Sequence, residues 1–296
     1  MLLKSIIYRG VFMNILLTGE NGYVANSIAK YIYLKTNKYK ALQKSLRANS
    51  LDTLSLNEIE TVIHAAGLVH RNEKLESEAK YFEINTELTY KLAVKAKESG
   101  VKQFIFFSTM AVYGNMQQII TRNTKTHPIT FYGKSKLAAE EVLLDLQDEH
   151  FKVAIIRPPM IYGPSCPGNY TLLSKLSCKS PIFPRVENKR SMLFIENLCE
   201  FIFQLIQNKE SGIFHPQDPQ YITTSVMVRE IAKVNDKTIY LSKLVGKLLK
   251  VIIGRKMVYQ KVFGDLYYAE ELSSYQDNSY QKYNLEQAIA ITEREK

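Results

Sequence analysis

Short apolar runs alternate with longer segments of helical periodicity through the first half of the chain. The first run, residues 15–17, ends at Thr18 and Gly19. From Tyr23 onward, apolar residues recur at the spacing that places them on one face of a helix, at Val24, Ile28 and Ile32. The opening of the chain therefore predicts a buried strand, a glycine turn and a helix.

The same alternation continues to about residue 164. Strands are predicted at 40–46, 61–67, 101–109 and 151–164, the last one broken at Pro158 and Pro159. Helices are predicted at 54–59, 80–99 and 132–146, and Gly100 provides a C-terminal stop for the second. Strands that alternate with helices in this order indicate an α/β fold with a parallel sheet covered on both faces.

Beyond Pro164 the regularity falls and proline becomes more frequent. This change predicts a first domain at 13–164 and a smaller, interleaved C-terminal lobe at 165–296, with part of 188–215 returning to the first domain. Met13 directly precedes the first strand, so residues 1–12 are expected to be a poorly ordered leader.

Composition narrows the classes of protein. The chain has 296 residues, of which 46% are hydrophobic and 23% charged, as in an ordinary soluble globular protein. Its three cysteines lie far apart, which argues against a disulfide scaffold or a metal site and favours a reducing, cytoplasmic location. No apolar run is long enough to span a membrane. The net charge of +10 occurs without a nucleic-acid-binding motif, so solvated lysines are expected to account for it.

The glycine turn has the pattern TGxxGxxA, with Gly19, Gly22 and Ala25 at the defined positions. Glycines between a strand and a helix let the backbone approach a pyrophosphate, which then sits on free N–H groups at the helix start. A generic strand-to-helix turn is the alternative while this motif stands alone.

The segment FYGKSK places Tyr132 and Lys136 four residues apart, so both side chains emerge on one face of a helix. A cation beside the phenol is expected to lower the pKa of Tyr132 toward neutrality and let it transfer a proton. Thr109 ends a parallel strand, at the edge where such sheets bind ligands. An ordinary helix with a surface lysine and a strand-end threonine are the alternatives, but the three features together favour a catalytic site.

In order along the chain, TGENGYVA, HAAG, Asn85, STMAVYG, YGKSK and RPPMIYGP resemble the extended short-chain dehydrogenase/reductase family of sugar-nucleotide epimerases, dehydratases and 4-ketoreductases. The resemblance covers nearly the whole chain from Met13. It implies a Rossmann-type, doubly wound, mostly parallel sheet, a nicotinamide cofactor and a nucleotide-sugar substrate. The first domain would then bind the dinucleotide and the second lobe the substrate.

Carried over by position, the resemblance implies that Thr109 is the catalytic hydroxyl, Tyr132 the general acid/base and Lys136 its supporting lysine. Cofactor contacts are implied for the following residues: Gly19, Asn21, Gly22, Tyr23, Val24, Arg47, Ala65, Ala66, Gly67, Asn85, Tyr132, Lys136 and Pro159. Substrate contacts are implied for Thr109, for Asn169 in CPGNY and for Arg190 in NKRSMLFIENL. A solvent-facing charge is the alternative for Arg190, and no second diphosphate arginine is evident downstream.

These second-lobe motifs, with HPQD, look most similar to reductases of capsule and O-antigen clusters that act on UDP-4-keto-6-deoxy-N-acetylhexosamines. A UDP-sugar 4-epimerase is the main alternative and a non-catalytic, NADP-sensing protein a remote one. The usual Gly-Trp-Pro stretch near the C-terminus is replaced by SSYQDNSYQKYN. The second strand ends in QKSLRAN, where Arg47 replaces the carboxylate that would favour NAD, so NADP(H) is expected although Glu20 opposes it.

A last pattern concerns the partners of the chain. LSKLVGKLLKVIIGRK places Lys243, Lys247 and Lys250 on one face of a helix and apolar residues on others. Such a helix could lie weakly on a membrane surface, although one that covers the core of the second lobe is the plainer interpretation. The resemblance also implies a possible homodimer.

Overall fold

In the computed structural model, the structure describes residues 13–46, 50–69, 76–114, 118–254 and 256–295. Six parallel strands form the central sheet in the order β10-β6-β4-β3-β1-β2. Their bounds are β1 Met13–Thr18, β2 Tyr39–Lys44, β3 Ile59–His64, β4 Gln103–Phe107, β6 Lys152–Ile156 and β10 Gly212–Phe214. The predicted α/β fold with a parallel sheet is confirmed.

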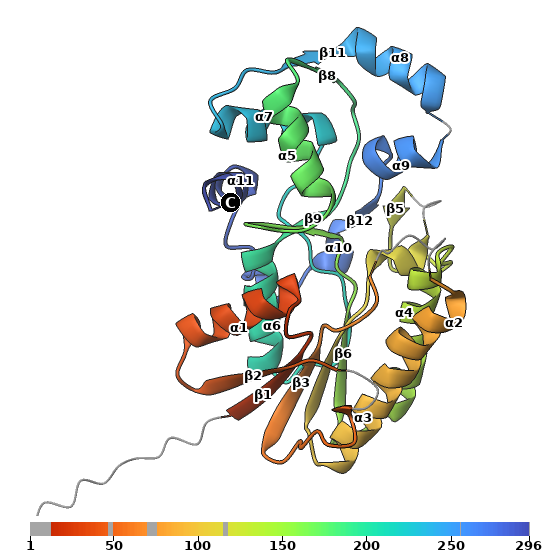
Figure 1. Cartoon of the computed structure of the whole chain (residues 1–296), viewed down its shortest axis with the longest axis vertical. Helices are drawn as coiled ribbons and strands as arrows, with labels where there is room; N and C mark the ends of the chain where they lie inside the picture. The colour runs from red at the N-terminus through yellow and green to blue at the C-terminus, as the bar shows by residue number, and fades with distance from the viewer. Residues whose placement is uncertain (1–12, 47–49, 70–75, 115–117, 255, 296) are drawn as a thin grey trace, which may run out of the picture.

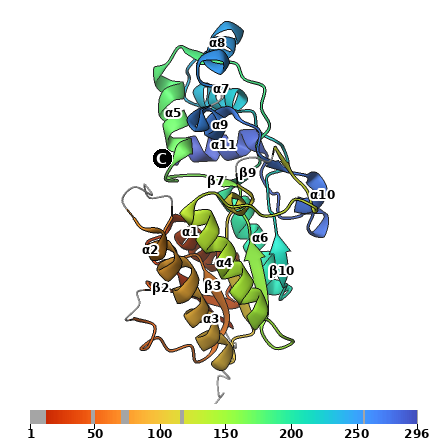
Figure 2. The ribbon, with the colours of Figure 1, turned by 90° about the vertical axis from the view of Figure 1, so that its right-hand side faces the viewer.

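Helices cover both faces of this sheet (Figures 1 and 2). One face carries α1 (Tyr23–Lys35) and α6 (Ile195–Gln207), and the other carries α2 (Glu78–Phe82), α3 (Leu88–Glu98) and α4 (Phe131–Leu146). Alternate residues of each strand serve the two cores: Leu17 and Ile105 pack on the α1 side, Leu16 and Phe104 on the α3 side. Burial on both faces explains why the strands are continuous apolar runs.

The remaining elements form the smaller lobe and the segments that join it to the sheet. They are the 3₁₀ turn η3 Met110–Tyr113, β5 Ile119–Ile120, β7 Met160–Tyr162, α5 Asn169–Lys179, β8 Ile182–Pro184, β9 Met192–Phe194, α7 Thr224–Val234, β11 Tyr240–Ser242, α8 Lys243–Ile253, α9 Met257–Phe263, β12 Tyr267–Tyr268, α10 Glu270–Ser273, the 3₁₀ turn η4 Gln276–Asn278 and α11 Leu285–Arg294. Three short parallel pairs lie outside the main sheet, β7 with β9, β8 with β11 and β5 with β12. The chain returns to the main sheet through α6 and β10. The domain limits at 164 and 188–215 stay predictions.

Two local expectations were wrong or incomplete. No helix forms at 54–59: Leu56 and Ile59 are buried separately, and Glu58 adopts a φ of 65° that interrupts helical geometry before β3. The long helix predicted at 80–99 begins at Glu78 and contains a π-helical turn, η2, at Glu83–Glu87. Among the described residues, no helix is both long and apolar enough to cross a membrane.

Candidate functional site

The glycine turn between β1 and α1 is shaped for close approach by a ligand. Gly19 adopts a φ of +92°, and a Cβ there would lie 3.3 Å from the backbone nitrogen of Ala66. Gly22 donates its N–H to the carbonyl of Gly19 at 2.6 Å and stands as the N-cap of α1, where no side chain caps the helix. The first N–H groups of α1 therefore face outward without a side-chain acceptor, which fits a diphosphate.

The predicted cofactor residues next to this turn occupy different environments. Asn21 is exposed in the turn, while Val24 is half-buried in the first turn of α1. The hydroxyl of Tyr23 is buried without a hydrogen-bond partner among the described residues, and a Cβ at Gly163 would lie 2.5 Å from it. Pro159 is buried three residues after the carboxyl end of β6. Asn21, Tyr23 and Val24 therefore belong to the β1 end of the candidate cofactor site, and Pro159 to the β6 end.

The loop Ala65-Ala66-Gly67 follows β3, the strand that pairs with β1, and lies against the glycine turn. Ala66 donates its N–H to Thr18 Oγ1 at 3.2 Å, and Thr18 bonds His64 Nδ1 at 2.7 Å. Burial lowers the pKa of His64 to about 3, so the imidazole is neutral near pH 7. The loop is thereby fixed to the ends of two adjacent strands.

Asn85 forms hydrogen bonds with the backbone of Leu68, the residue that follows this loop. Its Oδ1 accepts from Leu68 N at 2.7 Å, and its Nδ2 donates to Leu68 O at 3.1 Å and to Ser135 Oγ at 3.0 Å. The side chain is fully buried and lies in the π-helical turn η2, a feature that often occurs at functional sites. Asn85 thus connects the cofactor-side loop to α4, because Ser135 belongs to that helix.

The three predicted catalytic residues meet at the carboxyl end of β4. Thr109 follows β4 and caps η3, and it forms a hydrogen bond with Tyr132. Tyr132 and Lys136 are 7% and 3% exposed on α4. The Nζ of Lys136 lies 4.5 Å from the Phe106 ring centroid, and a Cβ at Gly67 would lie 3.2 Å from the same Nζ. The catalytic candidates therefore border the glycine-lined loop.

Protonation at this site differs from the sequence-based expectation that Lys136 lowers the pKa of Tyr132. Burial raises the pKa of Tyr132 to about 12, against the lowering effect of the Thr109 hydrogen bond. Burial also lowers the pKa of Lys136 to about 7, although Glu140 opposes this shift. Desolvation is the largest cause of both shifts because both groups are enclosed, and Lys136 is not among the causes of the Tyr132 shift. The phenol is therefore protonated at neutral pH, while Lys136 is poised to exchange a proton.

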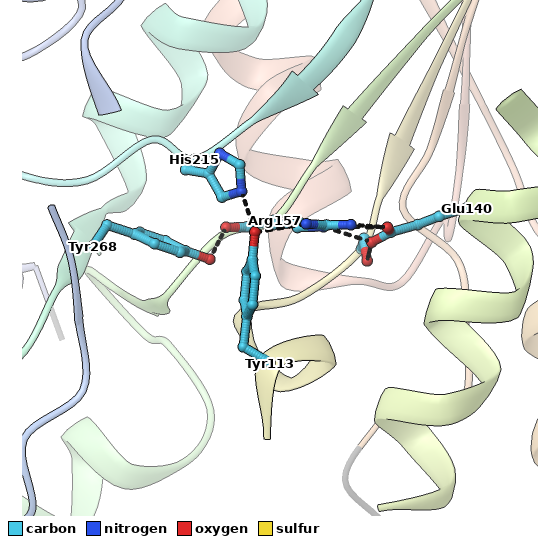
Figure 3. A network of polar contacts seen from close by, with 6 residues as sticks. Tyr113, Glu140, Arg157, His215 and Tyr268 are labelled. Carbon is cyan, nitrogen blue, oxygen red and sulfur yellow. Dashed lines mark hydrogen bonds and ion pairs between the residues drawn. The ribbon is translucent and has the colours of Figure 1, made fainter. Parts of the chain in front are cut away.

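Sequence reasoning missed a buried polar network that joins α4 to the segment after β6 (Figure 3). Glu140, one turn after Lys136, accepts Arg157 Nε at 3.1 Å and also accepts the hydroxyl of Ser108. Arg157 NH1 donates to Tyr113 Oη at 2.6 Å, and Tyr113 in turn bonds His215 Nε2 at 2.8 Å. The residues of this network are spread along the chain from Ser108 to His215, so no local sequence pattern predicts that they meet.

The same network reaches β12. Tyr268 donates its hydroxyl to the carbonyl of Arg157 at 2.7 Å, and its ring packs edge-on against His215 with centroids 5.0 Å apart. Figure 3 shows Arg157 at the centre, with Glu140 on one side and the aromatic residues on the other. A residue near the C-terminal part of the chain is thus tied to the end of β6.

Of the predicted substrate residues, Thr109 lies at the end of β4, and Asn169 and Arg190 lie in segments that follow Pro164. Asn169 is exposed at the first position of α5, beside a cavity of about 480 Å³ lined by Gly163, Ser165 and Tyr170 among others. Arg190 is half-buried, and its NH1 donates to the carbonyl of Gly264 at 2.9 Å. Burial lowers the pKa of Arg190, and Asp265 opposes that shift.

The structure describes only part of the segment predicted to contact the adenosine ribose of the cofactor. Arg47 lies outside the described residues. The end of β2 is described. Lys44 is exposed and pairs with Thr18 of β1, and its backbone carbonyl accepts the N–H of Gly19 at 3.1 Å. No carboxylate lies between Tyr39 and Leu46.

Comparisons with solved structures support the fold. RMD from Pseudomonas aeruginosa, complexed with NADPH, has a TM-score of 0.75 at 17% identity and covers 96% of this chain and 99% of its own. UDP-glucuronic acid 4-epimerase from Bacillus cereus, in complex with NAD, has a TM-score of 0.72 at 16% identity and covers 96% and 98%. At these identities the likeness shows the Rossmann-type fold alone.

Sequence relatives are more informative. A UDP-glucose 4-epimerase of Vibrio cholerae is 32% identical over 287 residues, covering 86% of each chain. An N-acetyl-α-D-glucosaminyl-diphospho-ditrans,octacis-undecaprenol 4-epimerase of Escherichia coli O157:H7 is 28% identical over 246 residues, covering 76% of this chain and 73% of its own. With a family profile that matches residues 15–215, the chain belongs to the NAD dependent epimerase/dehydratase family.

Proposed function

We propose that this protein is an NADPH-dependent 4-ketoreductase that acts on a UDP-4-keto-6-deoxy-N-acetylhexosamine, a precursor of bacterial surface polysaccharide. The observation that carries the proposal is the buried Tyr132, hydrogen-bonded to Thr109 and next to Lys136 at the carboxyl end of β4. That edge of a parallel sheet is where ligands bind.

The residues of the glycine turn and of the Ala65-Ala66-Gly67 loop fit a dinucleotide, which supplies a hydride when bound. Tyr132, protonated because its pKa is raised, donates its proton to the C4 carbonyl oxygen as that oxygen gains negative charge. Thr109 donates a hydrogen bond to the same oxygen. Lys136, whose pKa is about 7, is the adjacent group that can return a proton to the phenolate.

A protonated Tyr132 is the state that reduction of a ketone requires at its start. Reduction of a ketone begins with a proton donor, whereas oxidation of an alcohol begins with a proton acceptor. Tyr132 begins as a donor because burial raises its pKa to about 12. On the substrate side, we assign Asn169 to contacts with the sugar nucleotide and Arg190 to the diphosphate, since a guanidinium bonds phosphate oxygens two at a time.

The cofactor preference follows from the end of β2. Lys44 is exposed beside the glycine turn and no carboxylate is available there to bind ribose hydroxyls. With Arg47, it offers positive charge to a 2′-phosphate, while Glu20 in the glycine turn opposes it. A reductase must exchange its cofactor at every turnover, and NADPH suits that use.

A UDP-sugar 4-epimerase is the second candidate because the relatives from Vibrio cholerae and Escherichia coli carry that activity in their names. An epimerase would use the same Tyr132, first as a base and then as an acid, and would retain its cofactor. The non-catalytic NADP-sensing alternative has no use for a positioned phenol.

One preparation distinguishes these functions. It is incubated with UDP-4-keto-6-deoxy-N-acetylglucosamine and NADPH, and separately with UDP-N-acetylglucosamine alone. A ketoreductase consumes one NADPH for each keto sugar and leaves the second substrate unchanged. Conversion of UDP-N-acetylglucosamine to UDP-N-acetylgalactosamine, with no stoichiometric loss of NADPH on the keto sugar, would establish the epimerase instead. NADPH binding without either reaction would establish the sensor.

A further inference from the structure

Helix α8 presents apolar side chains that are largely exposed. Leu244 is 77% exposed, Leu248 57%, Val251 85% and Ile252 64%. These positions follow the spacing of one helix face. The helix lies at the outer end of the smaller lobe, far from the central sheet, in both ribbon views (Figures 1 and 2). The sequence-based interpretation that α8 covers the core of this lobe is therefore wrong.

The opposite side of α8 shows why this face stays outside. Gly246 is the buried residue of the helix, and a Cβ there would lie 2.2 Å from the carbonyl of Arg185, just after β8. This close approach fixes one side of the helix against the lobe. Ser242 caps the N-terminus of the helix: its hydroxyl accepts the N–H of Val245 at 3.2 Å.

The segment that carries α8 is basic, although it is flanked by Asp236 and Asp265 and the exposed Glu187 lies two residues after Arg185. Residues 237–264 contain seven Lys or Arg and no Asp or Glu. Within α8 itself, Lys243, Lys247 and Lys250 are exposed and form no ion pair with any residue that the structure describes. An exposed apolar stripe edged by lysines is the arrangement of helices that lie in the interface of an anionic membrane.

We propose that α8 docks this protein on the surface of an anionic lipid bilayer. The apolar face enters the headgroup region, and the lysines extend their apolar stems beside it while their ammonium groups bind lipid phosphates. Tyr240, 68% exposed two residues before the helix cap, adds the type of aromatic ring that favours this interface. This docking does not depend on which reaction the active site performs.

A second copy of the chain is a poorer occupant of the same face. In a two-fold dimer built on α8, each patch would meet itself, so the lysines of one copy would face those of the other. The residues 237–264 offer no carboxylate to offset that repulsion. An anionic bilayer meets both the apolar and the basic parts of the surface.

Vesicle flotation tests the proposal with the full chain. Vesicles contain phosphatidylglycerol and phosphatidylcholine in equal parts, or phosphatidylcholine alone. We expect binding to the anionic vesicles that weakens as salt is raised. Leu248→Glu/Val251→Glu should weaken binding to the anionic vesicles at least about tenfold. Lys243→Gln/Lys247→Gln/Lys250→Gln should also weaken that binding at least about tenfold, because each lysine near an anionic surface contributes about fivefold.

The matched control is Tyr33→Glu/Leu34→Glu, which changes two exposed residues of α1 in the other lobe. It should bind vesicles as the unmodified protein does, and circular dichroism should show that every variant is folded. The proposal is overturned if the unmodified protein does not float with anionic vesicles, or if Leu248→Glu/Val251→Glu floats equally well. It is also overturned if light scattering reveals a dimer that only the α8 variants dissociate.

Discussion

Glu140 and Arg157 form a buried ion pair that joins helix α4 to the carboxyl end of β6, with Arg157 Nε 3.1 Å from both carboxylate oxygens. The same carboxylate accepts the hydroxyl of Ser108, the residue before Thr109. The pair therefore fixes two of the elements that present the candidate catalytic groups, without occupying the site itself.

Removal of one partner should be costly. Glu140→Ala leaves the Arg157 guanidinium buried without its carboxylate, so the free energy of unfolding should fall by about 3–5 kcal/mol in urea titrations. Glu140→Leu/Arg157→Met removes both charges and should lose less than the two single changes added together. Glu83→Ala breaks the exposed pair with Lys80 and should cost at most about 1 kcal/mol. An equally small effect for Glu140→Ala would contradict the assignment.

Tyr132→Phe should lower turnover by about 10²-fold or more, the effect of losing a positioned proton donor. Cofactor binding, measured by fluorescence titration, should remain nearly intact because the hydroxyl alone is removed. Tyr90→Phe, on the exposed side of α3, makes the same chemical change away from the site and should leave turnover unchanged. Near-normal turnover in Tyr132→Phe would rule out the proton-donor role.

The parallel sheet and the shared helix face of Tyr132 and Lys136 could both be predicted from the sequence, for a physical reason. Strands buried on both faces are continuous apolar runs, and Tyr132 and Lys136 share a face because they are one helical turn apart. The Glu140–Arg157 ion pair and the hydrogen bond from Asn85 to Ser135 join residues that are distant in sequence. No local sequence pattern could predict these contacts. The raised pKa of Tyr132 was missed because burial depends on tertiary packing.

The stability of the protein should depend on pH through Lys136. Burial lowers its pKa in the folded state to about 7 from its ordinary value of 10.5. Between these values the unfolded chain binds more protons, so this group makes stability rise with pH through that window. Lys136→Met removes the buried ammonium and should therefore stabilise the fold at pH 7 and below, while abolishing activity.

That gain should shrink as pH rises toward about 10, where the lysine approaches neutrality in both states. Urea unfolding at pH 7 and at about pH 10 measures how the free energy of unfolding differs between Lys136→Met and the unmodified protein. Lys134→Met, an exposed position on the same helix paired with Glu78, is the control and should change stability by at most about 1 kcal/mol at either pH. A stabilisation by Lys136→Met that is the same at both pH values would argue against a lowered pKa.

The cofactor preference should reside at the end of β2. We expect NADPH to bind more tightly than NADH, because Lys44 and Arg47 can neutralise the 2′-phosphate and the strand offers no carboxylate to the ribose. Lys44→Ala and Arg47→Ala should each narrow the ratio of the two dissociation constants, mainly by weakening NADPH. Lys40→Ala removes an exposed lysine from the same strand, four residues earlier, and should leave that ratio unchanged. Equal affinities in the unmodified protein, or tighter binding of NADH, would remove the basis for an NADPH-dependent reductase and favour the epimerase, which keeps its cofactor through each turnover.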